Sequence, residues 1–71
     1  MAKLRVGVVG CGPMGRGHVK HYAGLADCEL VGVVDSDPKR RAEAALSSGA
    51  RAFADAKELI GRVDAVSIAT P

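Results

Sequence analysis

Three glycines with the spacing G-x-G-x-x-G, at positions 10, 12 and 15, constrain the fold of this chain more than any other feature. The residues before them, Leu4 to Val9, form a short, mostly apolar run rich in valine, which is typical of a strand buried on both faces. The residues after them recur at helical spacing, and Pro13 suits the first turn of a helix, where its missing N–H is no loss. The segment therefore predicts a strand, a tight turn and a helix.

Each glycine has a steric role in such a unit. Gly10 permits the tight turn, Gly12 lets the backbone approach a pyrophosphate, and Gly15 lets the helix pack closely on the strand. Unpaired N–H groups and the positive end of the helix dipole then face the phosphates. The glycines alone are weak evidence and can be purely structural, but a strand before them and a helix after them are the context that dinucleotide binding requires.

An acidic residue is expected about 20 residues further on, at the end of the second strand. Asp35 follows the apolar run Leu30 to Val34 and lies 20 residues after Gly15. Its carboxylate can accept hydrogen bonds from the ribose hydroxyls of NAD and repels the 2′-phosphate of NADP, although Arg40 or Arg41 can pair with that phosphate. The pattern favours NAD as the cofactor and leaves NADP open. The alternative for Asp35 is a loop acid that forms a turn.

Strands and helices alternate along the rest of the chain. We predict strands at residues 4–9, 30–34, 50–53 and 65–69, and helices at about 13–23, from 38 to a stop at 49, and briefly after 55. Alternation of this kind implies parallel pairing and right-handed crossovers. We therefore expect an α/β fold, a partial Rossmann-type doubly wound parallel sheet with strand order 3-2-1-4 and the sequence β-α-β-α-β-α-β.

Glycines and acidic residues mark the ends of the predicted helices. Asp37 and Asp55 are expected as N-caps, the latter in a capping-box variant with Glu58. Gly24 is expected as a left-handed stop of the first helix. The remaining predictions are that Gly49 stops the second helix, that Gly61 stops a third helix carrying Leu59 and Ile60, and that Ala42, Ala45 and Leu46 form the packed face of the second.

Size limits what the chain can do alone. It has 71 residues, with one Phe, one Tyr and no Trp, whereas domains typically have about 100–150 residues. The core must therefore be thin, and the fourth strand lacks its next neighbour and leaves an unprotected sheet edge. We expect self-association or marginal folding.

Charge and hydropathy exclude several classes of protein. The net charge is +2, and the basic residues do not form a nucleic-acid footprint. No run approaches a membrane span or a signal peptide, so neither a membrane nor a nucleic acid is expected as a partner. Cys11 and Cys28 fall at opposite edges of a parallel sheet, which predicts reduced thiols and a cytoplasmic protein.

Three further side chains carry weaker signals. Cys11 lies between the glycines, where a helix N-terminus can lower a thiol pKa, but a small filler residue is the favoured interpretation. His18 and His21 lie three residues apart on one helix with no third ligand nearby. They are interpreted as surface or packing residues, and no metal site and no catalytic residue is predicted.

With these residues placed, the chain resembles the N-terminus of the glucose–fructose oxidoreductase / inositol dehydrogenase (Gfo/Idh/MocA) family. The resemblance covers essentially the whole chain and rests on three segments: VGVVGCGPMG with His18 after it, LVGVVDSDP ending at Pro38, and AVSIATP ending at Pro71. Family members oxidise or reduce sugars, inositols and related polyols with NAD or NADP.

The resemblance implies a site residue by residue. Asp35 would contact the adenosine ribose, and Arg40 would lie near the adenine or the 2′ position. The pyrophosphate would be contacted by Gly10, Gly12, Pro13, Met14 and Gly15, and the nicotinamide side would be lined by Ala69, Thr70 and Pro71.

The family's catalytic lysine, its histidine and its second domain have no counterpart in residues 1–71. The resemblance therefore implies that residues 1–71 are the N-terminal part of a dinucleotide-binding domain, inactive alone, from an NAD(P)-dependent oxidoreductase whose catalytic and substrate domain is absent here. Two alternatives stay open: a non-catalytic module that senses a nucleotide, and a structural fragment that binds nothing.

Overall fold

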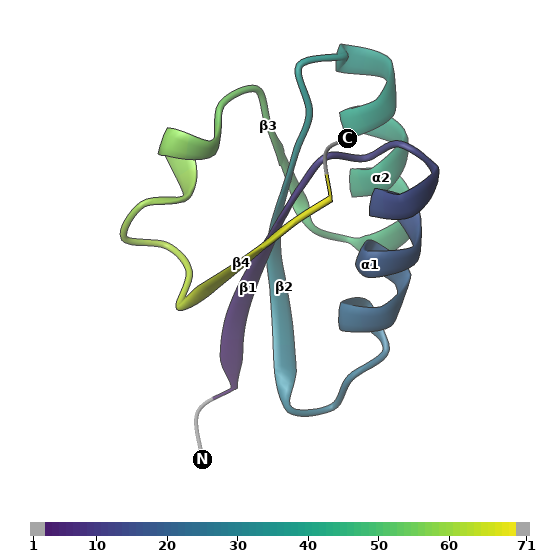
Figure 1. The fold of residues 1–71 in the computed structure, drawn as a ribbon. Coiled ribbons are helices and arrows are strands. Elements are labelled where there is room, and N and C mark those ends of the chain that lie inside the picture. The colour runs from purple at the N-terminus through teal and green to yellow at the C-terminus, as the bar shows by residue number, and fades with distance from the viewer. Residues whose placement is uncertain (1–2, 70–71) are drawn as a thin grey trace.

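The computed structural model describes residues 3–69, which form a four-stranded parallel sheet flanked by helices (Figure 1). The strand order is β3-β2-β1-β4, and every neighbouring pair is parallel. The elements are β1 (Leu4–Val9), α1 (Pro13–Ala23), β2 (Cys28–Val34), α2 (Pro38–Ser48), β3 (Arg51–Phe53), the 3₁₀ helix η1 (Ala56–Leu59) and β4 (Ala65–Ile68). The predicted Rossmann-type topology and strand order are confirmed.

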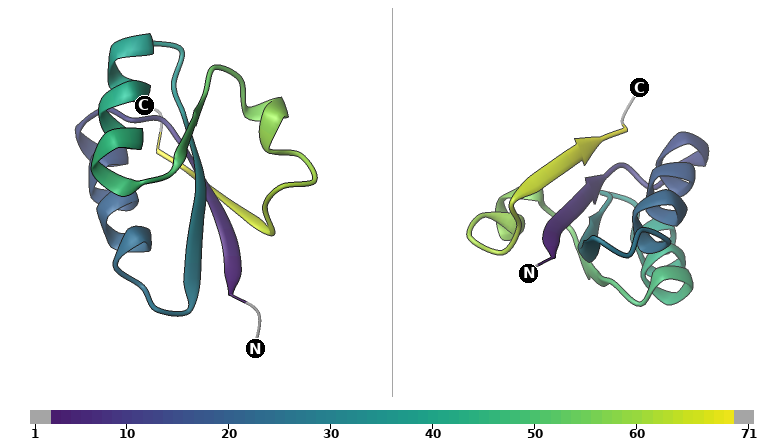
Figure 2. Two further views of the ribbon diagram at one scale, coloured as in Figure 1. Left: turned by 180° about the vertical axis from the view of Figure 1, so that it is seen from behind. Right: turned by 90° about the horizontal axis from the view of Figure 1, so that it is seen from below.

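The two faces of the sheet are covered unequally. The helices α1 and α2 lie side by side over one face, and η1 with its connections lies over the other (Figure 2). The larger core cluster fills the space beneath α1 and α2 and consists of Val8, Cys11, Val19, Val33, Ala44 and Ala50. A smaller cluster of Val34, Phe53 and Leu59 lies beneath η1.

Two glycines inside the strands make room for this smaller cluster. A Cβ atom on Gly7 would lie 2.6 Å from Leu59 Cδ1, and one on Gly32 would lie 2.7 Å from Phe53 Cε2. Both distances are shorter than real Cβ contacts, so larger residues would push the side chains of the small cluster off the sheet. Leu59, only 1% exposed, can therefore lie flat across β1 and β2.

Asp37 and Asp55 cap the second and third helices as predicted, but within residues 3–69 the Glu58 side chain does not form the hydrogen bond that the predicted capping-box variant requires. The carboxylate of Asp37 accepts a 2.9 Å hydrogen bond from the Lys39 N–H at the start of α2. Asp55 does the same for Lys57, also at 2.9 Å, at the start of η1. These contacts satisfy amide groups that a helix leaves without a partner in its first turn.

The helix ends agree with prediction only in part. Gly49 ends α2, as predicted, and adopts the left-handed conformation with a φ of 77°. Gly24 ends α1 as predicted, but the left-handed conformation predicted for it is wrong: its φ is −87°, because the chain continues into another right-handed turn in which the Leu25 N–H donates to the Tyr22 carbonyl. The third helix is a short 3₁₀ turn that already ends at Leu59, and Gly61, with a φ of 81°, lies in the turn beyond it.

The packed face of α2 differs from the prediction. Ala44 is buried against the sheet, whereas Leu46 is 87% exposed. Two residues further along a helix lie about 200° around its axis, so burial of Ala44 turns Leu46 toward solvent. Ala45 is half-buried, and Ala42 is exposed.

The strands differ from prediction mainly at their ends. The second strand begins at Cys28, two residues earlier than expected, and the third and fourth strands each lack one expected residue, at Ala50 and Ala69. Leu4 is 47% exposed, so β1 is not buried along its whole length. None of the helices in residues 3–69 has the length and apolar character needed to cross a membrane.

Candidate functional site

The start of α1 offers amide groups without a helical partner. The helical ladder begins with the Arg16 N–H, which donates to the Gly12 carbonyl at 2.8 Å. The amides of Met14 and Gly15 precede that bond, and Pro13 has no N–H. No side chain among the described residues caps this helix, and its first turn has no acidic residue. Unlike α2 and η1, α1 therefore presents its positive end uncapped, which suits an anion.

The glycines at positions 10 and 15 take the roles that the sequence predicts. Gly10 has a φ of 99°, in the region that L-residues avoid, and its N–H donates to the Val34 carbonyl at 2.8 Å. A Cβ on Gly15 would lie 1.7 Å from the Gly10 carbonyl oxygen. A side chain at position 15 would thus separate the helix from the turn that precedes it.

Space remains beside Gly12. Among the described residues, apart from its neighbours in the chain, a Cβ there would meet one heavy atom within 4 Å, the Arg40 Nη1 at 3.7 Å. In this part of the chain, the position is therefore bordered by the end of an exposed side chain and not by backbone. A ligand can therefore approach the loop here, as the pyrophosphate of a dinucleotide requires.

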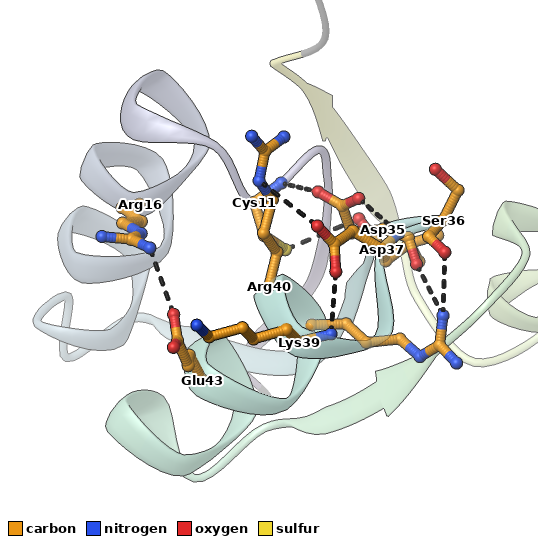
Figure 3. Close-up of polar contacts among 10 residues, drawn as sticks. Cys11, Arg16, Asp35, Ser36, Asp37, Lys39, Arg40 and Glu43 are labelled. Atoms are coloured by element: carbon orange, nitrogen blue, oxygen red, sulfur yellow. Dashed lines mark hydrogen bonds and ion pairs between the residues drawn. The ribbon is translucent and has the colours of Figure 1, made fainter.

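Asp35 lies beside the glycine loop and is joined to it. One carboxylate oxygen accepts a 2.8 Å hydrogen bond from the Cys11 N–H, and the other accepts a 2.9 Å bond from the Asp37 N–H (Figure 3). These bonds, with smaller contributions from Arg40 and Arg41, lower the pKa of Asp35 below its ordinary value. An ionised carboxylate has about four acceptor positions, so two remain for the hydroxyls of a ribose.

Arg40 and Arg41, two neighbouring residues in the first turn of α2, have different partners in the structure. Arg40 lies beside Gly12, with its Nε 3.8 Å from a carboxylate oxygen of Asp37 (Figure 3). Arg41 instead donates from Nη1 to the backbone carbonyls of Asp35, at 3.0 Å, and Ser36, at 3.4 Å. Arg40 therefore borders the site, whereas Arg41 holds the loop that carries Asp35.

Cys11 is a packing residue. Its side chain is fully buried, and its thiol donates to the Val34 carbonyl at 3.5 Å. Burial, followed by the nearby charge of Asp35, raises the pKa of this thiol. The structure therefore supports a small filler residue and contradicts a reactive, low-pKa thiol. Both Cys11 and Cys28 are free.

The carboxyl end of β4 closes another side of the site. The Ala69 N–H donates to the Val9 carbonyl at 2.8 Å, and a Cβ on Gly15 would lie 3.8 Å from the Ala69 Cβ. The residue is thus placed against the start of α1. Thr70 and Pro71, which were predicted to line the same side, lie outside the described residues.

His18 has a partner that sequence reasoning missed. Its Nδ1 lies 2.8 Å from the Ser67 Oγ. The sequence feature that could have indicated this pair is Ser67, a hydroxyl residue within the otherwise apolar fourth strand, which needs a polar partner when it is half-buried. His21 is exposed and contacts Tyr22 edge-on, with 5.4 Å between ring centroids. Within residues 3–69, no group of three or more His, Cys, Asp or Glu side chains is arranged to hold a metal ion.

Comparison with known proteins agrees with this geometry. Residues 4–71 match the family model described as an oxidoreductase family with an NAD-binding Rossmann fold, GFO_IDH_MocA. The UDP-N-acetylglucosamine 3-dehydrogenase of Acidithiobacillus ferrooxidans is 44% identical over 71 residues, which are 100% of this chain and 22% of that protein. The inositol 2-dehydrogenase of Pseudarthrobacter chlorophenolicus is 45% identical over 73 residues, covering 96% of this chain and 21% of that protein.

Solved structures show the same fold. The crystal structure of GenD2 from gentamicin A biosynthesis, in complex with NAD, superposes with a TM-score of 0.92 at 34% identity, covering 100% of this chain and 21% of that one. The chain spans about a fifth of the length of the curated relatives it matches, with 22% and 21% coverage of the two enzymes named above. The chain belongs to the Gfo/Idh/MocA oxidoreductase family and forms its NAD-binding Rossmann fold.

Proposed function

We propose that residues 1–71 are the N-terminal part of the dinucleotide-binding domain of an NAD-dependent dehydrogenase that acts on sugars, inositols or related polyols. The observation that carries the proposal is the position of the Asp35 carboxylate, 2.8 Å from the Cys11 N–H of the glycine loop. An anion-binding helix start and a ribose acceptor thus lie side by side. The names of the related dehydrogenases support the class of substrate.

The proposed contacts follow the order of the cofactor's parts. Asp35 accepts from the ribose hydroxyls of the adenosine, and Arg40 lies along the adenine or the 2′ position. The pyrophosphate is held by Gly10, Gly12, Pro13, Met14 and Gly15, and the nicotinamide side is lined by Ala69, Thr70 and Pro71.

The chemical contribution of this chain is binding and orientation. A bound nicotinamide supplies the capacity to accept or donate hydride. The chain holds the diphosphate on amides and the ribose on a carboxylate, and none of its proposed contacts supplies a proton acceptor or a substrate pocket. We therefore expect residues 1–71 alone to oxidise no polyol.

NAD is the proposed cofactor in preference to NADP. The hydrogen bonds from Cys11 and Asp37 keep Asp35 ionised at neutral pH, and its charge repels a 2′-phosphate. Arg40 is the cation nearest to compensate, but it is already placed near the Asp37 carboxylate, at 3.8 Å. NADP should therefore bind more weakly than NAD.

We also propose a cytoplasmic location and self-association of the 71-residue chain. Free cysteines favour a reducing compartment. Within the described part of the chain, β4 pairs with β1 alone and carries Val66, 46% exposed, and Ile68, 70% exposed. An apolar edge strand of this kind is a template for pairing with a second copy.

Titration of the isotope-labelled chain with NAD, followed by the NMR shifts of its backbone amides, tests the binding site. We expect shifts centred on Gly10 to Gly15 and on Asp35. Asp35→Asn should weaken binding about tenfold or more, because hydrogen bonds to a charged group contribute about 1.5–3 kcal/mol.

Asp64→Asn is the matched control for this experiment. Asp64 also accepts a backbone hydrogen bond, from the Arg5 N–H at 2.9 Å. It directly precedes β4 and therefore lies at the amino ends of the strands, whereas Asp35 lies at their carboxyl ends. This variant should bind NAD as the wild type does. An unchanged spectrum in the wild-type titration, or equal weakening in both variants, would contradict the proposed site.

A further inference from the structure

His18 and Ser67 form a polar link between α1 and β4 that the proposed cofactor contacts leave unused. The imidazole Nδ1 lies 2.8 Å from the hydroxyl oxygen, and both residues are half-buried. A hydroxyl group both donates and accepts, so the bond forms with either tautomer of the imidazole. The two residues are 49 positions apart in the sequence, and the link therefore joins segments that meet only in the folded chain.

The link lies next to another close approach between α1 and the end of β4. Gly15 and His18 are three residues apart and lie on one side of α1. Ser67 and Ala69 are two residues apart and face the same side of the sheet. A Cβ built on Gly15 would lie 3.8 Å from the Ala69 Cβ, so this first approach is close but has no directional bond, whereas His18 and Ser67 are joined by a hydrogen bond. The hydrogen bond therefore ties β4 to α1, in addition to the pairing of β4 with β1.

We propose that His18 is a positioning residue that sets, through Ser67, the spacing between the pyrophosphate-binding start of α1 and Ala69, which follows β4 on the proposed nicotinamide side of the site. The inference rests on the proposed function, since it requires a ligand that contacts both ends. NAD reaches both, and it binds more tightly when the spacing is set in advance. ADP ends at the pyrophosphate, so its binding does not depend on β4.

Calorimetric titration of the 71-residue chain with NAD and with ADP tests this role. Ser67→Ala and His18→Ala should each weaken NAD binding about three- to fivefold, the equivalent of one net hydrogen bond, and leave ADP binding unchanged. The double variant should bind NAD no more weakly than either single variant, because both changes remove the same bond.

Two further variants separate positioning from a general structural role. His18→Asn retains a polar atom close to the place of Nδ1 and should recover most of the NAD affinity. His21→Ala, an exposed position on the same helix, is the matched control and should bind both ligands as the wild type does. Hydrogen exchange of the Ala69 amide should be faster in Ser67→Ala, with no ligand present.

The possible results are distinct. Equal weakening of NAD and ADP binding, or wild-type affinity for NAD in Ser67→Ala, overturns the positioning role and leaves the proposed function intact. A wild-type chain that binds neither ligand overturns the proposed function and this inference with it.

Discussion

The Cys11 N–H donates to the Asp35 carboxylate across 2.8 Å, so the proposed ribose acceptor also holds the glycine loop. The same carboxylate accepts from Asp37, and it therefore joins the turn before α1 to the turn before α2. Its ionisation contributes to the folded state whether or not a cofactor is present. The proposed cofactor binding and the stability of the loop thus involve the same side chain.

Acid should destabilise the fold through this carboxylate. The folded pKa of Asp35 is lowered from its ordinary value of 3.8 by the Asp37 and Cys11 amides. At pH values between the folded and the unfolded pKa, the unfolded chain therefore binds more protons than the folded chain. The ionised carboxylate stabilises the fold fully above the unfolded pKa, and this stabilisation is lost as the pH falls through the folded pKa. Urea unfolding between about pH 2 and pH 6 should give a weaker pH dependence for Asp35→Asn than for the wild type. Identical pH profiles would show that the carboxylate does not stabilise the loop.

Substitution by alanine should change the free energy of unfolding in opposite directions at two glycines of α1. A Cβ at position 15 meets the Gly10 carbonyl oxygen at 1.7 Å, so Gly15→Ala should lower the free energy of unfolding by about 2–3 kcal/mol. A Cβ at position 17 meets no described atom within 4 Å beyond the backbone of its own helix, and Gly17→Ala should raise the free energy of unfolding by up to about 1 kcal/mol, since alanine favours the helix. Thermal unfolding of both variants measures the difference. A Gly15→Ala chain as stable as the wild type would show that the helix does not press on the turn.

The sequence was sufficient wherever local sterics or periodicity determine the structure. The order of elements, the turn at Gly10, the left-handed Gly49 and the Asp37 cap all depend on a few neighbouring residues. The position of Asp35 could also be predicted, because the carboxyl ends of parallel neighbouring strands share one edge of the sheet.

Other features depend on contacts that no local pattern encodes. Ala42, Ala44 and Ala45 are equally apolar, so only packing against the sheet selects Ala44 as the buried residue. The serine that pairs with His18 lies 49 residues away. The sequence around Gly7 does not show why a glycine is needed there, because the reason is its packing against Leu59.

The two cysteines should differ sharply in reactivity. Burial raises the pKa of the Cys11 thiol and shields it, whereas Cys28 is half-buried. We expect iodoacetamide at pH 8 to modify Cys28 about tenfold faster or more, with the two sites resolved by mass spectrometry of peptides. Urea should remove the difference, because the unfolded chain exposes both thiols. Equal rates in the folded protein would mean that the turn around Cys11 opens freely.

The two edges of the sheet differ in how they resist pairing with a second chain. The β3 edge is three residues long, and the guanidinium groups of Arg51 and Arg62 lie 5.2 Å and 5.5 Å from the centre of the Phe53 ring. Short length and charge both discourage edge pairing. The β4 strand carries no charge, and Ile68 on it is 70% exposed. Self-association should therefore occur through β4.

Sedimentation velocity over a range of concentrations tests this expectation. The wild-type chain should shift from monomer to dimer or larger species as its concentration rises, and Ile68→Lys should stay monomeric, because a lysine on the edge opposes pairing. Leu46→Lys is the matched control, since Leu46 is 87% exposed on α2, and α2 packs against β2 and β3 at the other side of the sheet from β4. It should associate as the wild type does. A wild-type chain that is monomeric throughout, or equal behaviour of the two lysine variants, would show that the β4 edge does not mediate association.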